Sequence, residues 1–322
     1  MIGTNRYIGS PVERIEDPRF LRGRGQFVGD LRREGMLHAA ILRSPVAHGL
    51  VAAVDTSAAL AIAGVRAVIT AKDIGAVPRI PLRLLPLPGT ERFLQPVIGA
   101  DRVRYVGEPV AVVLADNPAL AEDGAGAIAL DIEMLPPVSD GQASGRREIL
   151  LFEEAGTNAA IVFTGVKGDA DAAFRDADYV RRDRFAVQRH TALPMEPRGV
   201  LAESQGRMTV LGAAKVPFFN RDTLAAMLGL SAAAVDLIEN DVGGGFGARG
   251  EFYPEDFLIP FAARHVGRPV RWPEDRREHL TAMNHARQAD CEIEIACRSD
   301  GTILGVRGEV FVDLGAYVAP MD

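Results

Sequence analysis

Apolar and polar positions along the first part of the chain follow the periods of short strands and helices. Runs of strand length are bounded by Gly, Pro and Asp, and the segments between them show helical or loop patterns. The expected strands lie at 36–42, 65–71, 108–116 and 131–135, and the expected helices at 56–64 and 117–130. Asn117 and Pro118 stand at the N-cap and first position of the second helix, where these residue types are preferred. The pattern predicts a mixed α/β unit that ends in a polar linker.

The remaining half mixes hairpins with helices. Residues 199–212 alternate on both sides of a turn at 204–206, and residues 291–315 do the same around Asp300 and Gly301, so each segment predicts a β-hairpin. Two helices are expected between the hairpins, at 220–228 and 254–266. Gly229 and Gly267 follow them directly, which is typical of helix C-termini.

Composition narrows the classes of protein that fit this pattern. The chain has 322 residues, 48% of them hydrophobic, and a net charge of -7 at pH 7. A basic surface for nucleic acid or for an anionic membrane is therefore not expected. The longest apolar runs, such as 110–115, fall far short of the roughly 20 residues that a membrane span needs. The N-terminal segment has no apolar core of a secretory signal, so we expect a cytoplasmic protein.

The two cysteines lie on one expected strand, and alternation along that strand places them on the same face. Cys291, Ile293, Ile295 and Cys297 share one face of the segment 291–297. Six residues at about 3.4 Å each place the thiols about 20 Å apart, which excludes a disulfide or a shared metal. We expect both cysteines to be buried in the core, as free cysteines usually are.

A glycine-rich segment lies between the expected strand at 235–241 and the helix that begins at Pro254. Its glycines are Gly243, Gly244, Gly245, Gly247 and Gly250. The last three satisfy G-x-G-x-x-G, the spacing of a dinucleotide-binding turn. This spacing alone is a weak signal of a dinucleotide-binding site. The strand before it and the elements after it decide whether such a site is expected.

Three features of that context argue against a dinucleotide site. The preceding strand alternates apolar with charged residues, whereas the first strand of such a unit is apolar throughout. We expect the chain after the helix to enter an antiparallel hairpin rather than another crossover. Glu251, Glu255 and Asp256 place negative charge where a pyrophosphate would approach. A phosphate loop of the Walker type is excluded because no Lys-Ser/Thr pair follows Gly250.

Two interpretations of the glycine-rich segment remain. One is a turn without a ligand, although Phe246 amid five glycines is unusual for a simple exposed turn. The other is close approach of the backbone to a ligand in a deep cleft. Unpaired amides in such a turn suit an oxyanion, a metal oxo group or a cofactor edge, and spacing does not choose among them.

Six segments in order resemble the xanthine dehydrogenase and aldehyde oxidase family of molybdenum hydroxylases, which includes aerobic carbon monoxide dehydrogenase. The segments are 17–31, 41–59, 104–125, 195–203, 242–249 and 267–280, the last followed by His285, Ala286 and Arg287. The resemblance is to the large, molybdopterin-binding subunit and covers essentially the whole chain. It implies an α+β fold with four parts. These are an N-terminal extension at 1–15, an α/β hammerhead domain at 16–138, a linker at 139–146, and a first molybdopterin-binding domain at 147–322 that is truncated at its C-terminal end.

The resemblance also implies the residues of a cofactor site. They are Gly243, Gly244, Gly245, Phe246, Gly247, Ala248 and Arg249, which would lie against the molybdenum centre, and Lys215. Lys215 stands where the family has a glutamine, and an ammonium offers three donors and no acceptor. It would therefore pair with the anionic cofactor, mark a site that has lost its original chemistry, or be an ordinary surface lysine.

No catalytic residue is expected within this chain, because the family's base glutamate would lie beyond residue 322. We interpret Glu251, Glu255 and Glu274 as solvated or capping carboxylates. His190 and the other histidines show no metal-ligand spacing, and no side chain is expected to bind metal.

The resemblance implies a molybdenum–molybdopterin cofactor in its cytosine dinucleotide form. It further implies iron-sulfur clusters and FAD on partner subunits, and a separate chain or segment carrying the remaining molybdopterin domains. The expected function is hydroxylation of a carbon centre with oxygen from water, and the isolated chain should be inactive. The alternative is a non-catalytic scaffold subunit that docks partners without metal.

Overall fold

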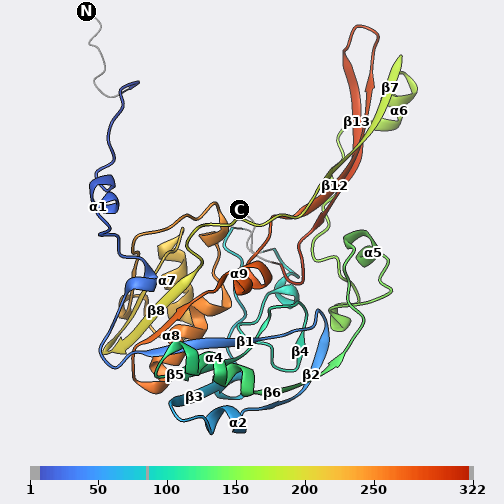
Figure 1. Ribbon diagram of the computed structural model, residues 1–322. Helices are drawn as coiled ribbons and strands as arrows, with labels where there is room; N and C mark the ends of the chain where they lie inside the picture. Colours follow the sequence, from blue (N-terminus) through green and yellow to red (C-terminus); the bar gives the residue numbers. More distant parts are fainter. Residues whose placement is uncertain (1–7, 85–86, 319–322) are drawn as a thin grey trace, which may run out of the picture.

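The computed structural model describes residues 8–84 and 87–318 (Figure 1). A seven-stranded mixed sheet forms the body, in the order β10-β9-β8-β11-β1-β5-β3. Its strands are β1 (Leu37–Arg43), β3 (Val65–Thr70), β5 (Pro109–Ala115), β8 (Gly199–Gln205), β9 (Arg207–Gly212), β10 (Val235–Ile238) and β11 (Val270–Pro273). β1 pairs in parallel with β11, with Leu37 opposite Val270, so both halves of the sequence share one sheet.

Helices cover both faces of this sheet. Alternation along β5 sends Val112 and Leu114 to one face, where they join the large core with α7 (Pro217–Met227) and α8 (Pro254–Val266). The intervening residues of β5 pack on the other face, beneath α2 (Ser57–Leu60) and α4 (Pro118–Ala127). Burial on both faces explains why the whole of β5 is apolar.

Two smaller sheets flank the body. The first has the order β4-β2-β6, formed by β2 (Gly49–Asp55), β4 (Arg102–Val103) and β6 (Ala129–Met134). The second has the order β13-β12-β7 and projects from the body as an arm (Figure 1). Its strands are β7 (Tyr179–Val187), β12 (Gln288–Cys297) and β13 (Ile303–Asp313), with α6 (Ala170–Arg175) against them.

Short elements complete the fold. They are α1 (Asp17–Leu21), α3 (Ala71–Ile74), α5 (Gly141–Gly145), α9 (Arg276–Ala282), and the 3-10 turns Val28–Asp30, Glu91–Phe93, Glu153–Ala155, Ala232–Ala234 and Ala248–Gly250. Among the helices described, none is long and apolar enough to cross a membrane.

Most of the expected elements are confirmed. The helix expected at 254–266 has those bounds, and the Asn117 side chain accepts a hydrogen bond from the Leu120 amide at 2.9 Å to cap α4. Both hairpins turn where expected, at Gly206 with φ 78° and Gly301 with φ 88°. β7 was missed because four of its nine residues are charged, which hides its alternation.

One structural premise about the glycine-rich segment is wrong. α8 leads into β11, which runs parallel to β10 in the same sheet, so the chain does make a crossover there. β8 and β9 lie between the two strands, which is why no sequence-adjacent parallel partner could be recognised. β10 is nevertheless an edge strand paired with β9, unlike the central first strand of a dinucleotide-binding unit.

The expected burial of the cysteines is also wrong. Cys291 and Cys297 do share one face of β12, but both are only partly buried. β12 belongs to the projecting arm, and that face of the arm has no covering layer within the described structure.

Candidate functional site

The glycine-rich loop between β10 and α8 is held at its two ends by Glu196 and Pro197. The Gly243 amide donates to Glu196 Oε2 at 2.7 Å, and the Glu196 amide donates back to the Gly243 carbonyl at 3.3 Å. At the other end, the buried Arg249 guanidinium pairs with Glu196 Oε2 at 3.0 Å and donates to the Pro197 carbonyl at 3.0 Å. The Arg249 side chain therefore anchors the loop to Glu196 and Pro197. Only the backbone of Arg249 continues the row of glycines.

The loop between these anchors has an unusual backbone. Gly244, Phe246 and Gly247 have φ values of 107°, 48° and 85°, all in the left-handed region. For Phe246 this conformation costs on the order of 1 kcal/mol or more, because its Cβ crowds the backbone. A local strain of this kind persists only where the surrounding structure fixes it, as the two anchors do here.

The strained turn leaves a row of free donors. The amides of Gly244, Gly245, Phe246 and Gly247 have no hydrogen-bond partner within the described structure. The next turn is closed internally, since the Ala248 amide donates to the Gly245 carbonyl at 2.9 Å and the Gly250 amide to the Gly247 carbonyl at 3.0 Å. Successive free amides in such a turn suit an anionic group.

The glycines of the loop are needed for different reasons. A Cβ on Gly243 would lie 2.4 Å from Glu196 Cβ, so packing inside the chain requires glycine there. Gly244 and Gly247 are favoured by their positive φ. A Cβ on Gly245 would meet nothing within 4 Å, and its φ is not in the left-handed region. Nothing within the described chain therefore requires glycine at 245, as expected where a ligand approaches the backbone.

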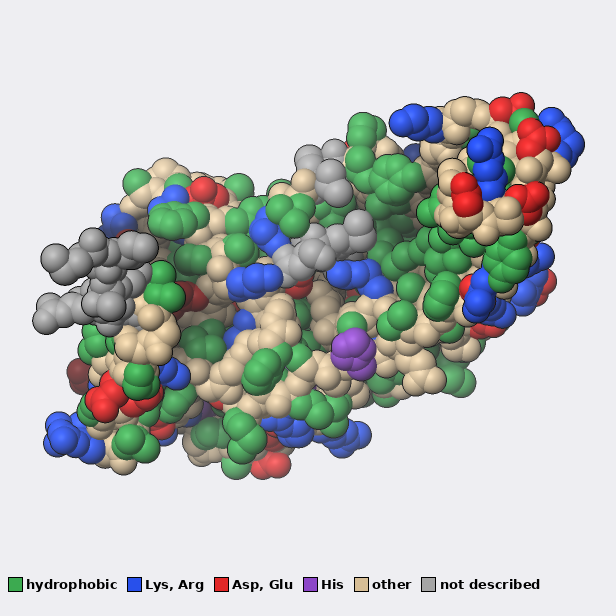
Figure 2. All heavy atoms as spheres, turned by 90° about the horizontal axis from the view of Figure 1, so that it is seen from above, with side chains coloured by type: hydrophobic (Ala, Val, Ile, Leu, Met, Phe, Trp, Pro, Cys, Tyr) green, Lys and Arg blue, Asp and Glu red, His purple; other side chains and the backbone are tan. Residues whose placement is uncertain are grey.

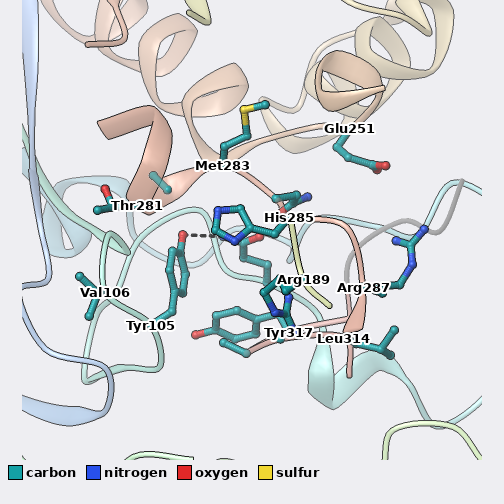
Figure 3. Close-up of a pocket in the computed structure, with 15 residues that line it drawn as sticks. Tyr105, Val106, Arg189, Glu251, Thr281, Met283, His285, Arg287, Leu314 and Tyr317 are labelled. Carbon is teal, nitrogen blue, oxygen red and sulfur yellow. Dashed lines mark hydrogen bonds between the residues drawn. The ribbon is translucent and has the colours of Figure 1, made fainter. Parts of the chain in front are cut away.

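The tip of the loop faces outward. Phe246 is 78% exposed. No residue from Gly243 to Gly250 lines the cavity described next, so the loop does not face the deep cleft expected for it; Glu251, the residue after Gly250, does line that cavity. That cavity of about 220 Å³ is bounded by the chain after α9, the chain after β13, and Tyr105. Figure 3 shows His285 near Arg189, Tyr105 and Tyr317, with Glu251 and Arg287 to one side.

Two side chains of the cavity have polar atoms without partners. Glu251 Oε2 and His285 Nε2 are buried and make no hydrogen bond. Burial raises the pKa of Glu251, although the charges of Arg83, Arg287 and Lys215 oppose the shift. Burial also lowers the pKa of His285, so its neutral form is favoured. A free carboxylate oxygen and a free imidazole nitrogen can orient a small polar molecule.

Lys215 lies next to the loop. Its amide donates to the Arg249 carbonyl at 3.1 Å, which fixes the backbone of the segment before α7 against the loop. Its side chain is exposed, and its charge acts on Glu251. The correspondence of Lys215 to the family's glutamine remains a prediction.

A buried ion network lies behind the loop. Arg198 pairs with Glu255 at 2.9 Å and with Glu274 at 2.5 Å, and Arg43 pairs with Glu255 at 2.8 Å. Glu274 also contacts His279 Nδ1 at 2.9 Å, and the other His279 nitrogen faces the Ala192 carbonyl at 2.8 Å. The interpretation of Glu251, Glu255 and Glu274 as solvated or capping carboxylates is wrong, because all three are buried. Two arginines compensate the burial of Glu255 and Glu274.

The network is connected to the loop through Tyr253. The Arg198 guanidinium carbon lies 4.0 Å from the centre of the Tyr253 ring. The Tyr253 hydroxyl donates to the Ala248 carbonyl at 2.6 Å. Arg43 and Arg198 were missed in the sequence because their partners come from segments more than 50 residues away. Among the described residues, no group of three His, Cys, Asp or Glu side chains could hold a metal.

Comparison with known proteins identifies the class of protein to which this chain belongs. The family model described as "Molybdopterin cofactor-binding domain" matches residues 151–322, and "Aldehyde oxidase and xanthine dehydrogenase, a/b hammerhead domain" matches residues 22–136. The chain belongs to this aldehyde oxidase and xanthine dehydrogenase family of molybdenum hydroxylases, and the expected α+β fold is confirmed. Both matches lie inside the domains expected at 16–138 and 147–322, whose boundaries remain a prediction.

Similarity to individual proteins is consistent with this family. The chain is 37% identical over 320 residues to the nicotine 6-hydroxylase large subunit of Paenarthrobacter nicotinovorans, covering 98% of this chain and 39% of that one. It is 32% identical to the carbon monoxide dehydrogenase large chain of Hydrogenophaga pseudoflava, covering 95% and 40%. The crystal structure of quinoline 2-oxidoreductase from Pseudomonas putida 86 matches with a TM-score of 0.84 at 33% identity, covering 94% and 39%. The chain thus spans about two fifths of the length of these relatives.

Proposed function

We propose that this chain is the cofactor-facing part of a molybdenum hydroxylase large subunit. The observation that carries the proposal is the row of free amides from Gly244 to Gly247, with an unfilled Cβ position at Gly245, in the loop that is followed by the cavity residue Glu251. The reaction would convert R–H and water into R–OH, releasing two electrons and two protons. The bound molybdenum cofactor would supply this two-electron oxidation.

The residues of the loop fit an anionic cofactor. Four free amides supply donors without a side chain in the way, and Lys215, whose backbone is bonded to the loop at Arg249, adds a positive charge that acts on Glu251. Arg249 contributes indirectly, because its guanidinium is used to anchor the loop to Glu196. In this proposal the loop backbone binds the edge of the cofactor and Phe246 borders the substrate.

The cavity residues would orient the substrate. Glu251 accepts a hydrogen bond from a donor on the substrate, and neutral His285 donates or accepts through Nε2. Burial keeps both groups out of bulk water, which strengthens these hydrogen bonds. The family's base glutamate is expected outside this chain, so neither residue is assigned to proton abstraction.

Further parts of the proposal follow from the resemblance. The two released electrons require acceptors, and the two cysteines lie on the arm rather than in a cluster-binding set. Iron-sulfur clusters and FAD would therefore be carried by partner subunits. The cofactor would be the cytosine dinucleotide form, and the assembly would work in the cytoplasm.

The proposal is tested on the assembly that contains this chain, purified from its native cells. It is supplied with an electron-accepting dye, water labelled with oxygen-18, and nicotine or quinoline in turn. We expect one of these substrates to take up a labelled oxygen atom as the dye is reduced. Dye reduction with unlabelled product, or an intact assembly that oxidises none of them and holds no molybdenum, contradicts the proposal and favours a scaffold role.

A further inference from the structure

Tyr253 is a buried tyrosine whose position is fixed by the start of α8. It is 4% exposed and directly precedes Pro254, the first residue of that helix. Its amide donates to Asp256 Oδ2 at 2.9 Å, and the Asp256 amide donates back to the Tyr253 carbonyl at 3.0 Å. The first turn of α8 therefore sets the place from which the Tyr253 side chain extends.

The face of the Tyr253 ring is held by Arg198. The guanidinium carbon lies 4.0 Å from the centre of the ring. The guanidinium donates to Glu255 Oε2 at 2.9 Å and to Glu274 Oε1 at 3.1 Å and 2.5 Å. Because these charge-assisted hydrogen bonds are buried, Arg198 has little freedom to move away from the ring. The ring is thus a rigid support between the ion network and the loop.

The Tyr253 hydroxyl connects this support to the loop. It donates to the Ala248 carbonyl at 2.6 Å. Within residues 8–84 and 87–318, no other residue outside the loop hydrogen-bonds to residues 244–248. The anchors at Gly243 and Arg249 act on the two ends of the loop, so Tyr253 is what fixes its middle.

Ala248 transmits this constraint to the free donors. Its amide donates to the Gly245 carbonyl at 2.9 Å. That carbonyl and the Phe246 amide belong to one planar peptide unit and point in opposite directions, so a bond that fixes the first also fixes the second. Phe246 has a φ of 48°, an uncommon conformation that its surroundings must impose. The direction of the free Phe246 amide therefore depends on Tyr253 through two hydrogen bonds.

Positive charge near the loop does not replace this orientation. Arg189 and Arg287 line the cavity that Glu251 also lines, and Figure 2 shows Lys and Arg side chains gathered near the middle of the body on the face that it views. Such charges attract an anion in any orientation, whereas a hydrogen bond weakens steeply as donor and acceptor lose alignment. The amides therefore decide how an anion lies at the loop, and their direction has to be held.

We propose that Tyr253 is a positioning residue, whose hydroxyl aims the free amides of the loop, above all that of Phe246, at the anionic edge of the bound cofactor. This inference rests on the proposed function and adds a residue that touches neither the cofactor nor the substrate. Burial raises the pKa of Tyr253, although the charge of Arg198 opposes the shift. The hydroxyl therefore keeps the proton that it donates throughout the neutral range.

Two matched variants test this role in the assembly purified from native cells. Tyr253→Phe removes the hydroxyl and keeps the ring that Arg198 contacts. Thr90→Val is the control: Thr90 is 3% exposed, and its hydroxyl donates to the Leu87 carbonyl at 2.6 Å. The control thus loses a buried hydrogen bond of the same kind and length that involves no residue of the loop.

Two measurements on the molybdenum-containing assembly report on the loop. Hydrogen exchange with peptide mass spectrometry follows the amides of residues 244–247, and electron paramagnetic resonance of the reduced molybdenum follows the surroundings of the cofactor. We expect these amides to exchange about fivefold faster in Tyr253→Phe, the factor that corresponds to one hydrogen bond of ordinary net strength. The resonance signal should shift in the same variant, and Thr90→Val should leave both readings unchanged.

Other outcomes are equally clear. Loss of molybdenum from an intact Tyr253→Phe assembly, with full retention in Thr90→Val, also supports the inference. Unchanged exchange or an unchanged signal in a fully loaded Tyr253→Phe assembly overturns it. Equal effects of the two variants overturn it as well, because they would arise from lost stability and not from the loop.

Failure of the proposed function gives a different result. The reference is the original assembly from a strain that cannot synthesise molybdopterin, in which the loop amides should exchange faster than in the loaded assembly. Equal exchange in these two samples contradicts the proposed function. Faster exchange without the cofactor, together with no effect of Tyr253→Phe, retains the proposed function and overturns only the role of Tyr253.

Discussion

At the scale of single residues, the loop separates glycines that the chain itself needs from one that it does not need. Gly243 is closed in by Glu196, whereas the Cβ position of Gly245 is open. A structural role for Gly243 and a ligand-binding role for Gly245 therefore predict different effects when each glycine is substituted.

We predict opposite effects for alanine at these two positions. Gly243→Ala should destabilise the chain by about 1–3 kcal/mol, because the new Cβ forces Glu196 to shift. Gly245→Ala should leave the free energy of unfolding unchanged but reduce the molybdenum retained by the assembly. Urea unfolding and metal analysis measure the two effects. Full metal retention in Gly245→Ala would remove the reason for glycine at this position.

Lys215 provides a second prediction at this scale. Lys215→Gln keeps a donor beside the loop and removes the charge, so the assembly should keep its metal and equal or exceed the original turnover. Stability should change little, since the side chain is exposed. Loss of metal in this variant would show that the cation holds the cofactor, contrary to the glutamine correspondence.

At the scale of elements, the buried ion network connects β1, α8 and α9 behind the loop. Burial alone would raise the pKa of Glu255, but the charges of Arg198 and Arg43 lower it to about 2. Glu255 is therefore ionised in the folded chain, and its removal would leave two buried guanidinium groups short of a partner.

We predict that Glu255→Gln destabilises the chain by about 3–5 kcal/mol near neutral pH, the usual effect of breaking a buried ion pair. Because the folded pKa is below the ordinary value of 4.5, the stabilisation is present above pH 4.5 and is lost as pH falls through about 2. The gap between variant and original should narrow in acid. Asp116→Asn, which breaks the exposed Arg66–Asp116 pair, is the control and should have no measurable effect. A gap that stays constant down to pH 2 would contradict this assignment.

A second buried carboxyl predicts the opposite pH dependence. Burial raises the pKa of Glu108 to about 7, although the Tyr317 hydroxyl and the Arg104 amide donate to it, each at 2.6 Å. The folded state keeps a proton that the unfolded state releases above pH 4.5, so this group lowers stability as pH rises from 4.5 to 7.

Glu108→Gln keeps one acceptor oxygen, for either the Tyr317 hydroxyl or the Arg104 amide, and cannot ionise. As pH rises from 4.5 to 7, we expect the variant to lose less stability than the original chain, by up to about 1.4 kcal/mol per pH unit. Burial also raises the pKa of Asp256 to about 7, so part of the slope should remain in the variant. Urea midpoints at pH 5 and pH 7.5 measure the difference. An unchanged slope would mean that Glu108 is ionised throughout.

The sequence predicted elements better than contacts. Asn117 and Gly267 mark helix ends by their own chemistry, so the bounds of α8 could be read locally. The burial of Glu255 depends on Arg43 and Arg198, which are distant in sequence. The exposure of Cys291 depends on the lack of a covering layer on that face of β12 within the described structure, which a strand pattern cannot encode.

The same limit applies to the site. The glycine spacing predicted close approach of a ligand, but the distinction between Gly243 and Gly245 required the position of Glu196. The cavity beside the loop brings together Tyr105, Glu251, His285 and Tyr317 from four separate segments. No motif joins these residues, so the cavity could not be predicted from the sequence.

At the scale of the whole molecule, the two family domains form one body. The parallel pairing of β1 with β11 continues the sheet across both halves of the sequence. The loop, the cavity and the arm are all attached to this sheet or to segments leaving it, so one body carries all three.

The most direct measurement is the molybdenum content of the assembly purified from native cells grown with molybdate. The account predicts molybdenum in proportion to this chain, with less in Gly245→Ala than in the original. An intact assembly that contains this chain and its large-subunit partner but no molybdenum would contradict the central claim.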